Sequence, residues 1–253
     1  MKTLVLRIEY DGASYAGWQR QPNAMTVQEA VETALMRISG DKLNAIAAGR
    51  TDSGVHARGQ VTHTYLNKEF PVREEKIRKA MNANLPRDIR INGAAIINRK
   101  FNARFDASAR EYSYSIITRD SVFLNHFATY YKFPINPELM NGAAELFVGS
   151  HDFTSFSKFN AETKHYVCNV DICRWERVEP IMWRLTIRAD RFVYGMVRGV
   201  TGAMLDFARG KRSIGSIRRA LDNPSREGQS PLAPPEGLTL EKIFYPPDLD
   251  LFK

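Results

Sequence analysis

The pattern of apolar and polar residues divides the chain into alternating strands and helices. Apolar residues alternate with more polar ones from Leu4 to Glu9, which predicts a half-buried strand ending at a turn. Thr26 then precedes Glu29 by three residues in a capping-box pattern, and apolar residues recur behind it at helical spacing. The apolar stripe consists of Val27, Ala30, Val31, Ala34, Leu35 and Ile38. The pattern predicts a helix that ends near Gly40.

The rest of the first hundred residues also alternates between predicted strands and helices. A short strand is expected near 45–48, a longer one at 61–66, a helix after Pro71 and a further strand at 89–97. The order strand, helix, strand, strand, helix, strand is that of a split β-α-β unit. The second half repeats strands and helices. Strands are expected from Arg104 through Ile116 and at 128–133, 167–177, 183–190 and 238–244, and helices at 137–147, 192–208 and 213–221.

These elements predict an α+β fold of two ferredoxin-like (split β-α-β) halves, residues 1–103 and 104–253, that share a continuous, mostly antiparallel central sheet. Residues 223–237 are rich in Pro, Gly and Ser. Because a strand follows them, we interpret this stretch as a surface loop and not as a linker between domains.

Composition and charge narrow the class of protein. The chain has 253 residues, of which 43% are hydrophobic, enough for a sizeable core, so disorder as the main state is excluded. Lys and Arg number 36 against 28 Asp and Glu, which gives a formal charge of +8. Such a balance favours a polyanionic partner such as nucleic acid, although a basic enzyme without one would show it too.

The sequence gives little support to disulfide-rich, secreted, membrane-spanning, nucleotide-binding or metal-binding classes of protein. Cys168 and Cys173 are too few for a disulfide framework or a Cys-rich zinc site, so we interpret both as packing residues. The N-terminal segment meets a charge after a few apolar residues, which indicates neither a signal sequence nor a membrane span and favours a cytoplasmic location. No glycine-rich nucleotide loop and no metal-ligand spacing is found, so nucleotide cofactors and metals lose their usual support.

Residues 49–57 are the first candidate for chemistry. Asp52 stands in an Asp-Ser-Gly turn at a strand end, next to Arg50, where a carboxylate can meet a substrate. The alternative is a plain Asx-turn without chemistry. His56 is equally consistent with a turn or packing residue.

A tyrosine face is the second candidate. Tyr112 and Tyr114 share one face of a predicted strand, with Arg104 and Arg110 nearby. Such a face can stack bases and hold phosphates, but tyrosines also suit strands and fill cores.

A glycine-rich helix is the third candidate. Interior glycines cost helix stability, so Gly199 and Gly202 predict the close approach of another backbone or of nucleic acid. Arg198 is the polar exception in this apolar stretch. If buried it needs an acidic partner, for which we propose Asp52, and otherwise it lies at the solvent edge.

Many short segments of the chain together resemble one family. Residues 49–57 look like the catalytic-aspartate motif of the tRNA pseudouridine synthase A family, and further segments match in order. They are Tyr10-Asp11-Gly12, Gly17-Trp18-Gln19-Arg20-Gln21, Thr26-Val27-Gln28-Glu29, Asn82-Ala83-Asn84-Leu85-Pro86, Phe101-Asn102-Ala103-Arg104-Phe105, Tyr112-Ser113-Tyr114, His151-Asp152-Phe153, Phe192-Val193-Tyr194-Gly195-Met196-Val197-Arg198 and Ala233-Pro234-Pro235-Glu236-Gly237-Leu238.

The resemblance implies an isomerase that converts uridine to pseudouridine at positions 38, 39 and 40 of the tRNA anticodon stem-loop. It implies that Asp52 is the nucleophile, that Tyr112 stacks on the target base and that Arg198 pairs with Asp52. Arg50 matches a residue associated with base flipping.

Arg104, Arg110 and His56 complete the expected substrate-binding set. The resemblance further implies a homodimer whose basic clefts, between the two halves, hold the tRNA. It also implies an enzyme without a cofactor or a metal.

Three positions depart from the family pattern, namely Asn102, Cys168 and Val193. None belongs to the expected catalytic set, so they bear on substrate preference more than on reaction type. Two other functions stay open from the sequence. The chain could modify a different RNA, or it could bind or remodel RNA without catalysis.

Overall fold

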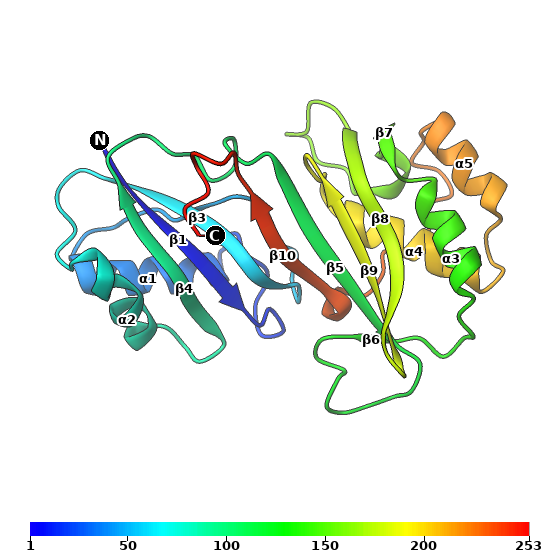
Figure 1. Ribbon diagram of the computed structural model, residues 1–253, viewed down its shortest axis with the longest axis horizontal. Helices are drawn as coiled ribbons and strands as arrows, with labels where there is room; N and C mark the ends of the chain where they lie inside the picture. Colours follow the sequence, from blue (N-terminus) through cyan, green and yellow to red (C-terminus); the bar gives the residue numbers. More distant parts are fainter. Residues whose placement is uncertain (253) are drawn as a thin grey trace. The chain divides into compact units, whose positions relative to one another are not determined.

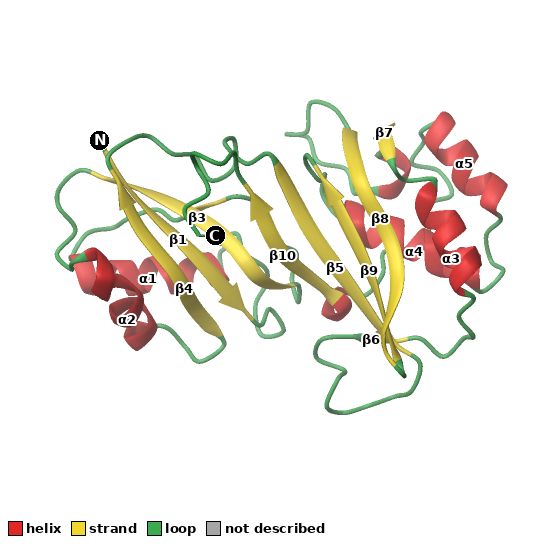
Figure 2. Ribbon diagram, viewed as in Figure 1, coloured by secondary structure: helices red, strands yellow, loops and turns green. Residues whose placement is uncertain are grey.

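The computed structural model describes residues 1–252, which form two compact units. Unit 1 comprises Met1–Ser108 together with the described residues from Thr239 onward, and unit 2 comprises Ala109–Leu238. Each unit combines helices with a sheet that is mixed but mostly antiparallel (Figure 1, Figure 2). The fold is therefore α+β, as the sequence predicts.

Unit 1 has the strand order of a split β-α-β unit. Its elements are β1 (Lys2–Tyr10), α1 (Val27–Ser39), β2 (Ile46–Ala47), β3 (His56–Leu66), α2 (Glu74–Asn84), β4 (Ile89–Ile97) and most of β10 (Leu238–Phe244). β1 lies between β3 and β4 and is antiparallel to both, and β2 pairs antiparallel with β3. The resulting order β4-β1-β3-β2 is the expected one. β10 adds a short parallel pairing at the start of β3.

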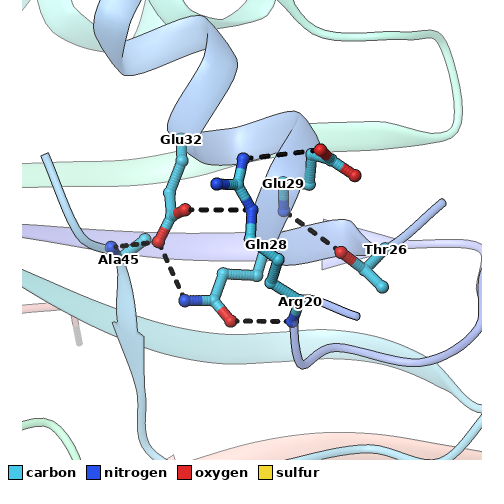
Figure 3. A network of polar contacts seen from close by, with 6 residues as sticks. All are labelled: Arg20, Thr26, Gln28, Glu29, Glu32 and Ala45. Carbon is cyan, nitrogen blue, oxygen red and sulfur yellow. Dashed lines mark hydrogen bonds and ion pairs between the residues drawn. The ribbon is translucent and has the colours of Figure 1, made fainter. Parts of the chain in front are cut away.

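The start of α1 is held by the predicted cap and by a polar network around it (Figure 3). The hydroxyl of Thr26 accepts a hydrogen bond from the amide of Glu29 at 3.4 Å, and Gly40 ends the helix in the left-handed region with φ 75°. Glu32 accepts from the amide of Ala45 at 3.0 Å and from the side chain of Gln28 at 2.8 Å. These contacts tie the helix to the segment that leads into β2.

Unit 2 repeats part of the same arrangement. Its elements are β5 (Ala109–Ile117), β6 (Thr129–Tyr130), α3 (Pro137–Glu145), β7 (Gly149–Asp152), β8 (Val167–Glu179), β9 (Met182–Ala189), α4 (Met196–Ala208) and α5 (Ile214–Asp222), with short 3-10 turns at Thr154–Phe156 and Pro235–Gly237. β9 lies between β5 and β8 and is antiparallel to both. The chain order β5-α3-β8-β9-α4 therefore matches the first five elements of a split β-α-β unit.

Most predicted elements form, with local differences. α4 begins at Met196 and not at residue 192, because Gly195 takes a left-handed conformation with φ 72° that breaks the helix before it. β3 extends back to His56, well before the predicted start at residue 61, and the strand predicted at 128–133 shortens to Thr129–Tyr130. β7 was not predicted, since its four residues Gly149–Asp152 carry no apolar alternation.

The division into units differs from the predicted boundary of 103/104. The break falls after Ser108, and the described residues from Thr239 onward belong with unit 1. The tail is tied there by several contacts. The hydroxyl of Tyr245 donates to the carbonyl of Ala103 at 2.7 Å, and a guanidinium nitrogen of Arg7 donates to the carbonyl of Phe252 at 2.9 Å. Such long-range contacts leave no mark in local sequence patterns.

The two cysteines behave as packing residues. Cys168 and Cys173 are free and buried, and burial raises the pKa of each thiol to about 12. Thiols of this kind are protonated and unreactive at neutral pH. Among the helices formed by residues 1–252, none has the length and apolar character to cross a bilayer.

Candidate active site

The loop that carries Asp52 connects β2 to β3 and forms the predicted turn. The amide of Val55 donates to the carbonyl of Asp52 at 3.2 Å, and Gly54 takes φ 76°, which closes the turn. Asp52 is partly exposed, whereas Thr51 and Val55 are buried on either side of it. The residues on both sides of Asp52 are thus packed, while Asp52 itself is half-buried.

A second loop, between β1 and α1, supports this turn from behind. The amide of Trp18 donates to the carbonyl of Thr51 at 3.1 Å, and the hydroxyls of Tyr10 and Thr51 lie 2.7 Å apart. Ser53 donates from its hydroxyl to the carbonyl of Tyr15 at 3.2 Å. Burial raises the pKa of Tyr10 to about 12, so this residue is a neutral hydrogen-bonding group.

Two glycines allow the loops to come this close. A Cβ added at Gly12 would lie 2.0 Å from the carbonyl oxygen of Val55, and one added at Gly17 would lie 2.6 Å from the carbonyl oxygen of Thr51. Both distances are far below van der Waals contact. In the sequence Gly12 stands out as part of a turn signal and Gly17 as part of a family resemblance, and no local pattern there predicts their supporting role.

His56 and Arg50 flank Asp52 and differ in environment. His56 is 2% exposed, and its Nδ1 accepts a hydrogen bond from the amide of Gly12 at 3.1 Å and lies 3.1 Å from a carboxylate oxygen of Asp11. These contacts are those of a turn residue, the alternative that the sequence left open, and its role in substrate binding stays a prediction. Arg50 is exposed.

Arg104 lies in the loop after β4, also in unit 1. Its amide donates to the side-chain oxygen of Asn102 at 3.0 Å, and its guanidinium lies over the exposed ring of Phe105 at 5.5 Å from the centroid. The guanidinium of Arg104 therefore packs against an exposed aromatic side chain.

Tyr112 lies on β5 in unit 2. Its side chain is 7% exposed, and its ring meets that of Phe192 edge to face with the centroids 5.0 Å apart. Arg110, two residues earlier on the same face, donates to the carbonyl of Asp190 at 2.8 Å. The loop after β9 thus contacts both residues and links them to the start of α4.

Arg198 occupies the first turn of α4 and is tied to a distant segment of unit 2. Its Nε donates to the carbonyl of Ala233 at 2.7 Å, and its own carbonyl accepts from the amide of Ala233 at 3.0 Å. The glycines that follow permit the predicted close approach. A Cβ at Gly199 would lie 2.1 Å from the carbonyl oxygen of Phe156, and one at Gly202 would lie 2.0 Å from that of Pro231. Of the two alternatives, backbone and nucleic acid, it is backbone that approaches.

Tyr114 behaves differently from Tyr112 although the two share a strand face. It is fully buried, its hydroxyl lies 2.7 Å from that of Thr129, and it donates to the carbonyl of Pro234 at 2.9 Å. Burial raises the pKa of Tyr114, and the nearby charge of Arg198 offsets part of that rise. Tyr114 is thus a core residue that fixes the segment next to Arg198.

The described residues hold no preformed metal centre. In residues 1–252 no three His, Cys, Asp or Glu side chains stand together in a way that could hold a metal ion. The two units carry different parts of the expected site, with Asp52, Arg50, His56 and Arg104 in unit 1 and Tyr112, Arg110 and Arg198 in unit 2. The pairing of Asp52 with Arg198 stays a prediction.

Comparisons with known proteins identify the family. The family model described as tRNA pseudouridine synthase matches residues 7–106 and 143–246. The chain belongs to this family. It is 37% identical to the tRNA pseudouridine synthase A of Chlamydia trachomatis serovar A, across 99% of this chain and 95% of that one. The tRNA pseudouridine synthase A of Halalkalibacterium halodurans is 38% identical across 94% and 90% of the two chains.

Membership makes the protein a tRNA pseudouridine synthase, an isomerase. Asp52 and Arg198 fall within the stretches that match the pseudouridine synthase model, whereas Tyr112 and Arg110 fall between them. One solved structure that resembles the chain, that of an archaeal box H/ACA sRNP Nop10-Cbf5 complex, has a TM-score of 0.35 at 11% identity and covers 94% of this chain and 46% of the other.

Proposed function

We propose that the protein isomerises uridines 38, 39 and 40 of the tRNA anticodon stem-loop to pseudouridine, with Asp52 as the nucleophile. The observation that carries the proposal is the match of the tRNA pseudouridine synthase model over both halves of the chain, with Asp52 inside the first matched stretch. A tRNA substrate also implies a cytoplasmic location.

The reaction is an isomerisation and balances without a second substrate. The bond between N1 of uracil and C1′ of the ribose breaks, the base turns, and a bond from C5 to C1′ forms. The proton lost from C5 is balanced by the one gained at N1. As the nucleophile, Asp52 forms a bond either to the base or to the sugar carbon C1′. That bond breaks again before the product leaves, which regenerates the carboxylate, so neither a cofactor nor a metal is required.

The environment of Asp52 supports this role. Its loop is held by the backbone contacts of Trp18 and Tyr15 and by the close packing at Gly17, which limits movement of the carboxylate. A catalytic group has to be held close to its productive position, because a displacement of about 1 Å can cost about a hundredfold in rate. The partial exposure of Asp52 leaves the carboxylate accessible to a base that has left its stack.

The remaining site residues take complementary parts in the proposal. A base inside a stem cannot reach the carboxylate, so the target nucleotide has to flip out, at a cost of a few kcal/mol. The exposed Arg50 occupies the vacated position, Tyr112 stacks on the flipped base, and Arg198 neutralises Asp52. This requires that the two halves share one sheet, with a basic cleft between them. Arg104, Arg110 and His56 contribute to binding.

The direct test is pseudouridine mapping on unmodified tRNA transcripts, with wild-type protein and with Asp52→Asn. We expect modification on the 3′ side of the anticodon arm, lost in the variant, without added nucleotide or metal. Asp248→Asn is a matched control, because Asp248 is 70% exposed and pairs at the surface with Arg99, and such pairs contribute little. Equal product from wild type and Asp52→Asn would contradict the nucleophile assignment.

Other outcomes would favour the two alternatives. Modification of a different RNA, with tRNA left unmodified, would show that the protein is a pseudouridine synthase with another RNA substrate. RNA binding or rearrangement without any isomer formed by the wild-type protein would favour a non-catalytic role. We further propose that the protein acts as a homodimer, and light scattering at working concentration that gave the mass of one chain would overturn that part.

A further inference from the structure

Exposed aromatic rings and cations gather on three neighbouring loops of unit 2, outside the expected catalytic set. Phe159 is 68% exposed and Tyr194 is 46% exposed. The ammonium of Lys158 lies 5.0 Å from the ring centroid of Tyr194, and the guanidinium of Arg226 lies 5.5 Å from that of Phe159. We call these four residues the aromatic–cation surface.

The topology of unit 2 brings the first two loops together. β8 and β9 are antiparallel, with Val170 near the start of β8 opposite Ala189 at the end of β9 (Figure 1). The start of β8 and the end of β9 therefore lie side by side. The loop before β8 and the loop after β9 are therefore neighbours. The amide of Lys158 donates to the carbonyl of Tyr194 at 2.7 Å, which joins them directly.

The third loop is fastened to the first by side chains. Arg226 donates from Nη1 to the carbonyl of Ser157 at 2.9 Å, and its guanidinium also faces Tyr166, at 4.7 Å from the ring centroid. Gln229 donates to the carbonyl of Thr154 at 3.0 Å. Arg226 lies against two aromatic rings, Phe159 and Tyr166, and thereby positions Phe159 at the surface.

The chain is closely packed around Lys158 and Tyr194. Gly195, with φ 72°, turns the chain immediately after Tyr194, and a Cβ added there would lie 3.3 Å from Cγ of Lys158.

The surface also adjoins the expected site. Tyr194 lies four residues before Arg198, and Phe192, two residues earlier, contacts Tyr112. A nucleotide on this surface would therefore be close to a base held by Tyr112.

We propose that the aromatic–cation surface binds unpaired nucleotides of the RNA substrate that flank the target uridine. The bases stack on Phe159 and Tyr194, Lys158 contacts a phosphate, and Arg226 is a positioning residue. The inference rests on the proposed function and adds to it a place for the flanking nucleotides. Exposed rings that carry cations match a ligand with flat bases and negative charge, since stacking and charge then act together. An apolar protein partner would leave the exposed ammonium of Lys158 without compensation.

The first test is binding of an anticodon stem-loop RNA to Phe159→Ala and Tyr194→Ala, alone and combined, measured by fluorescence anisotropy. Loss of one stacked base corresponds to an affinity about 5-fold to 160-fold lower. Tyr194→Phe keeps the ring and should bind like the wild type. Phe123→Ala is the matched control, because Phe123 is 89% exposed in another loop of unit 2. A double alanine variant with unchanged Kd and KM would overturn the proposal.

The second test addresses the phosphate contact. Lys158→Gln should reduce the slope of log Kd against log salt by about 0.7, the value for one contact to a single strand. Phe159→Ala should leave that slope unchanged. An unaltered slope in Lys158→Gln would remove the phosphate contact from the proposal.

A third measurement needs no variant and so does not depend on their folding. A stem-loop with 2-aminopurine next to the target position should lose fluorescence on binding to the wild-type protein, because the reporter base stacks on an aromatic side chain. An unquenched reporter at every flanking position would overturn the proposal. The proposed function fails separately. The wild-type protein could bind the RNA without isomerising it, while the alanine variants bind it less tightly. That result would support the aromatic–cation surface and contradict the proposed function.

Discussion

Gly17 sets how closely the loop after β1 approaches the turn of Asp52. Its φ of 93° disfavours any other residue, and an added Cβ would lie only 2.6 Å from the carbonyl oxygen of Thr51. The sequence showed Gly17 within a family segment, but no local pattern indicated its contact. That contact joins residues 34 positions apart and depends on the tertiary structure.

We expect Gly17→Ala to lower isomerisation more than tenfold while the protein stays folded, because the added methyl group displaces Thr51 and with it Asp52; a shift of about 1 Å can cost about a hundredfold. Gly40→Ala is the matched control. Gly40 also has a positive φ, 75°, but open space around it, so it should lose about 1 kcal/mol of stability and keep its activity. Product assays and urea unfolding check both, and equal activity of the two variants would contradict the role of Gly17.

His63 makes the stability of unit 1 depend on pH. It is fully buried on β3, its Nδ1 accepts from the amide of Ala103 at 3.1 Å, and burial lowers its pKa below the usual 6.5, against a smaller opposing effect of Asp106. The unfolded chain therefore binds a proton at higher pH than the folded protein does. The stability from neutral His63 is complete above about pH 6.5 and is lost as the pH falls from there toward the lowered value.

We expect the free energy of unfolding to decline below about pH 6.5 in the wild type and to decline less in His63→Asn, which keeps an acceptor for Ala103. His126→Asn is the control, since His126 is exposed. Urea unfolding at several pH values gives the comparison. Parallel declines in wild type and His63→Asn would show that other groups control the acid response.

At the scale of elements, α1 and α4 show how far local patterns reach. The cap at Thr26, the apolar stripe and the end at Gly40 were all predicted for α1, because each depends on residues within one or two turns. For α4 the sequence predicted a close approach at its glycines and a start at residue 192. The approach is confirmed and the start is wrong, because a left-handed Gly195 interrupts an apolar run that looks helical.

The glycines of α4 make a testable contrast with that of α3. Gly199→Ala should destabilise the protein, because the new Cβ would meet the carbonyl oxygen of Phe156 at 2.1 Å and push the turn at Thr154–Phe156 away. Gly142→Ala, in α3 with nothing within 4 Å, should stabilise by about 1 kcal/mol through helix propensity alone. Chemical unfolding of both variants checks the sign, and stabilisation by Gly199→Ala would contradict the close packing.

At the scale of the whole molecule, the net charge of +8 has a consequence for RNA binding. We expect the affinity for tRNA, and activity at limiting tRNA, to fall steeply as salt rises. Each phosphate contact contributes a slope of about −0.7 to −0.9 in a plot of log affinity against log salt. Anisotropy titrations between about 50 and 200 mM salt measure it, over a range in which 6–10 contacts would lower affinity by about 10³–10⁵. A flat response would contradict a broad basic surface.

The sequence by itself determined the α+β class, nearly all helices and strands, the family and the residues expected at the site, because these depend on local periodicity, caps and short motifs. Only the tertiary structure decided which loops support Asp52, that His56 is buried, that Tyr114 belongs to the core, and that most of β10 and the described residues after it join unit 1. Each of these outcomes depends on residues far apart in the sequence, so no local pattern encodes it. The same holds for the aromatic–cation surface, whose members come from three separate loops.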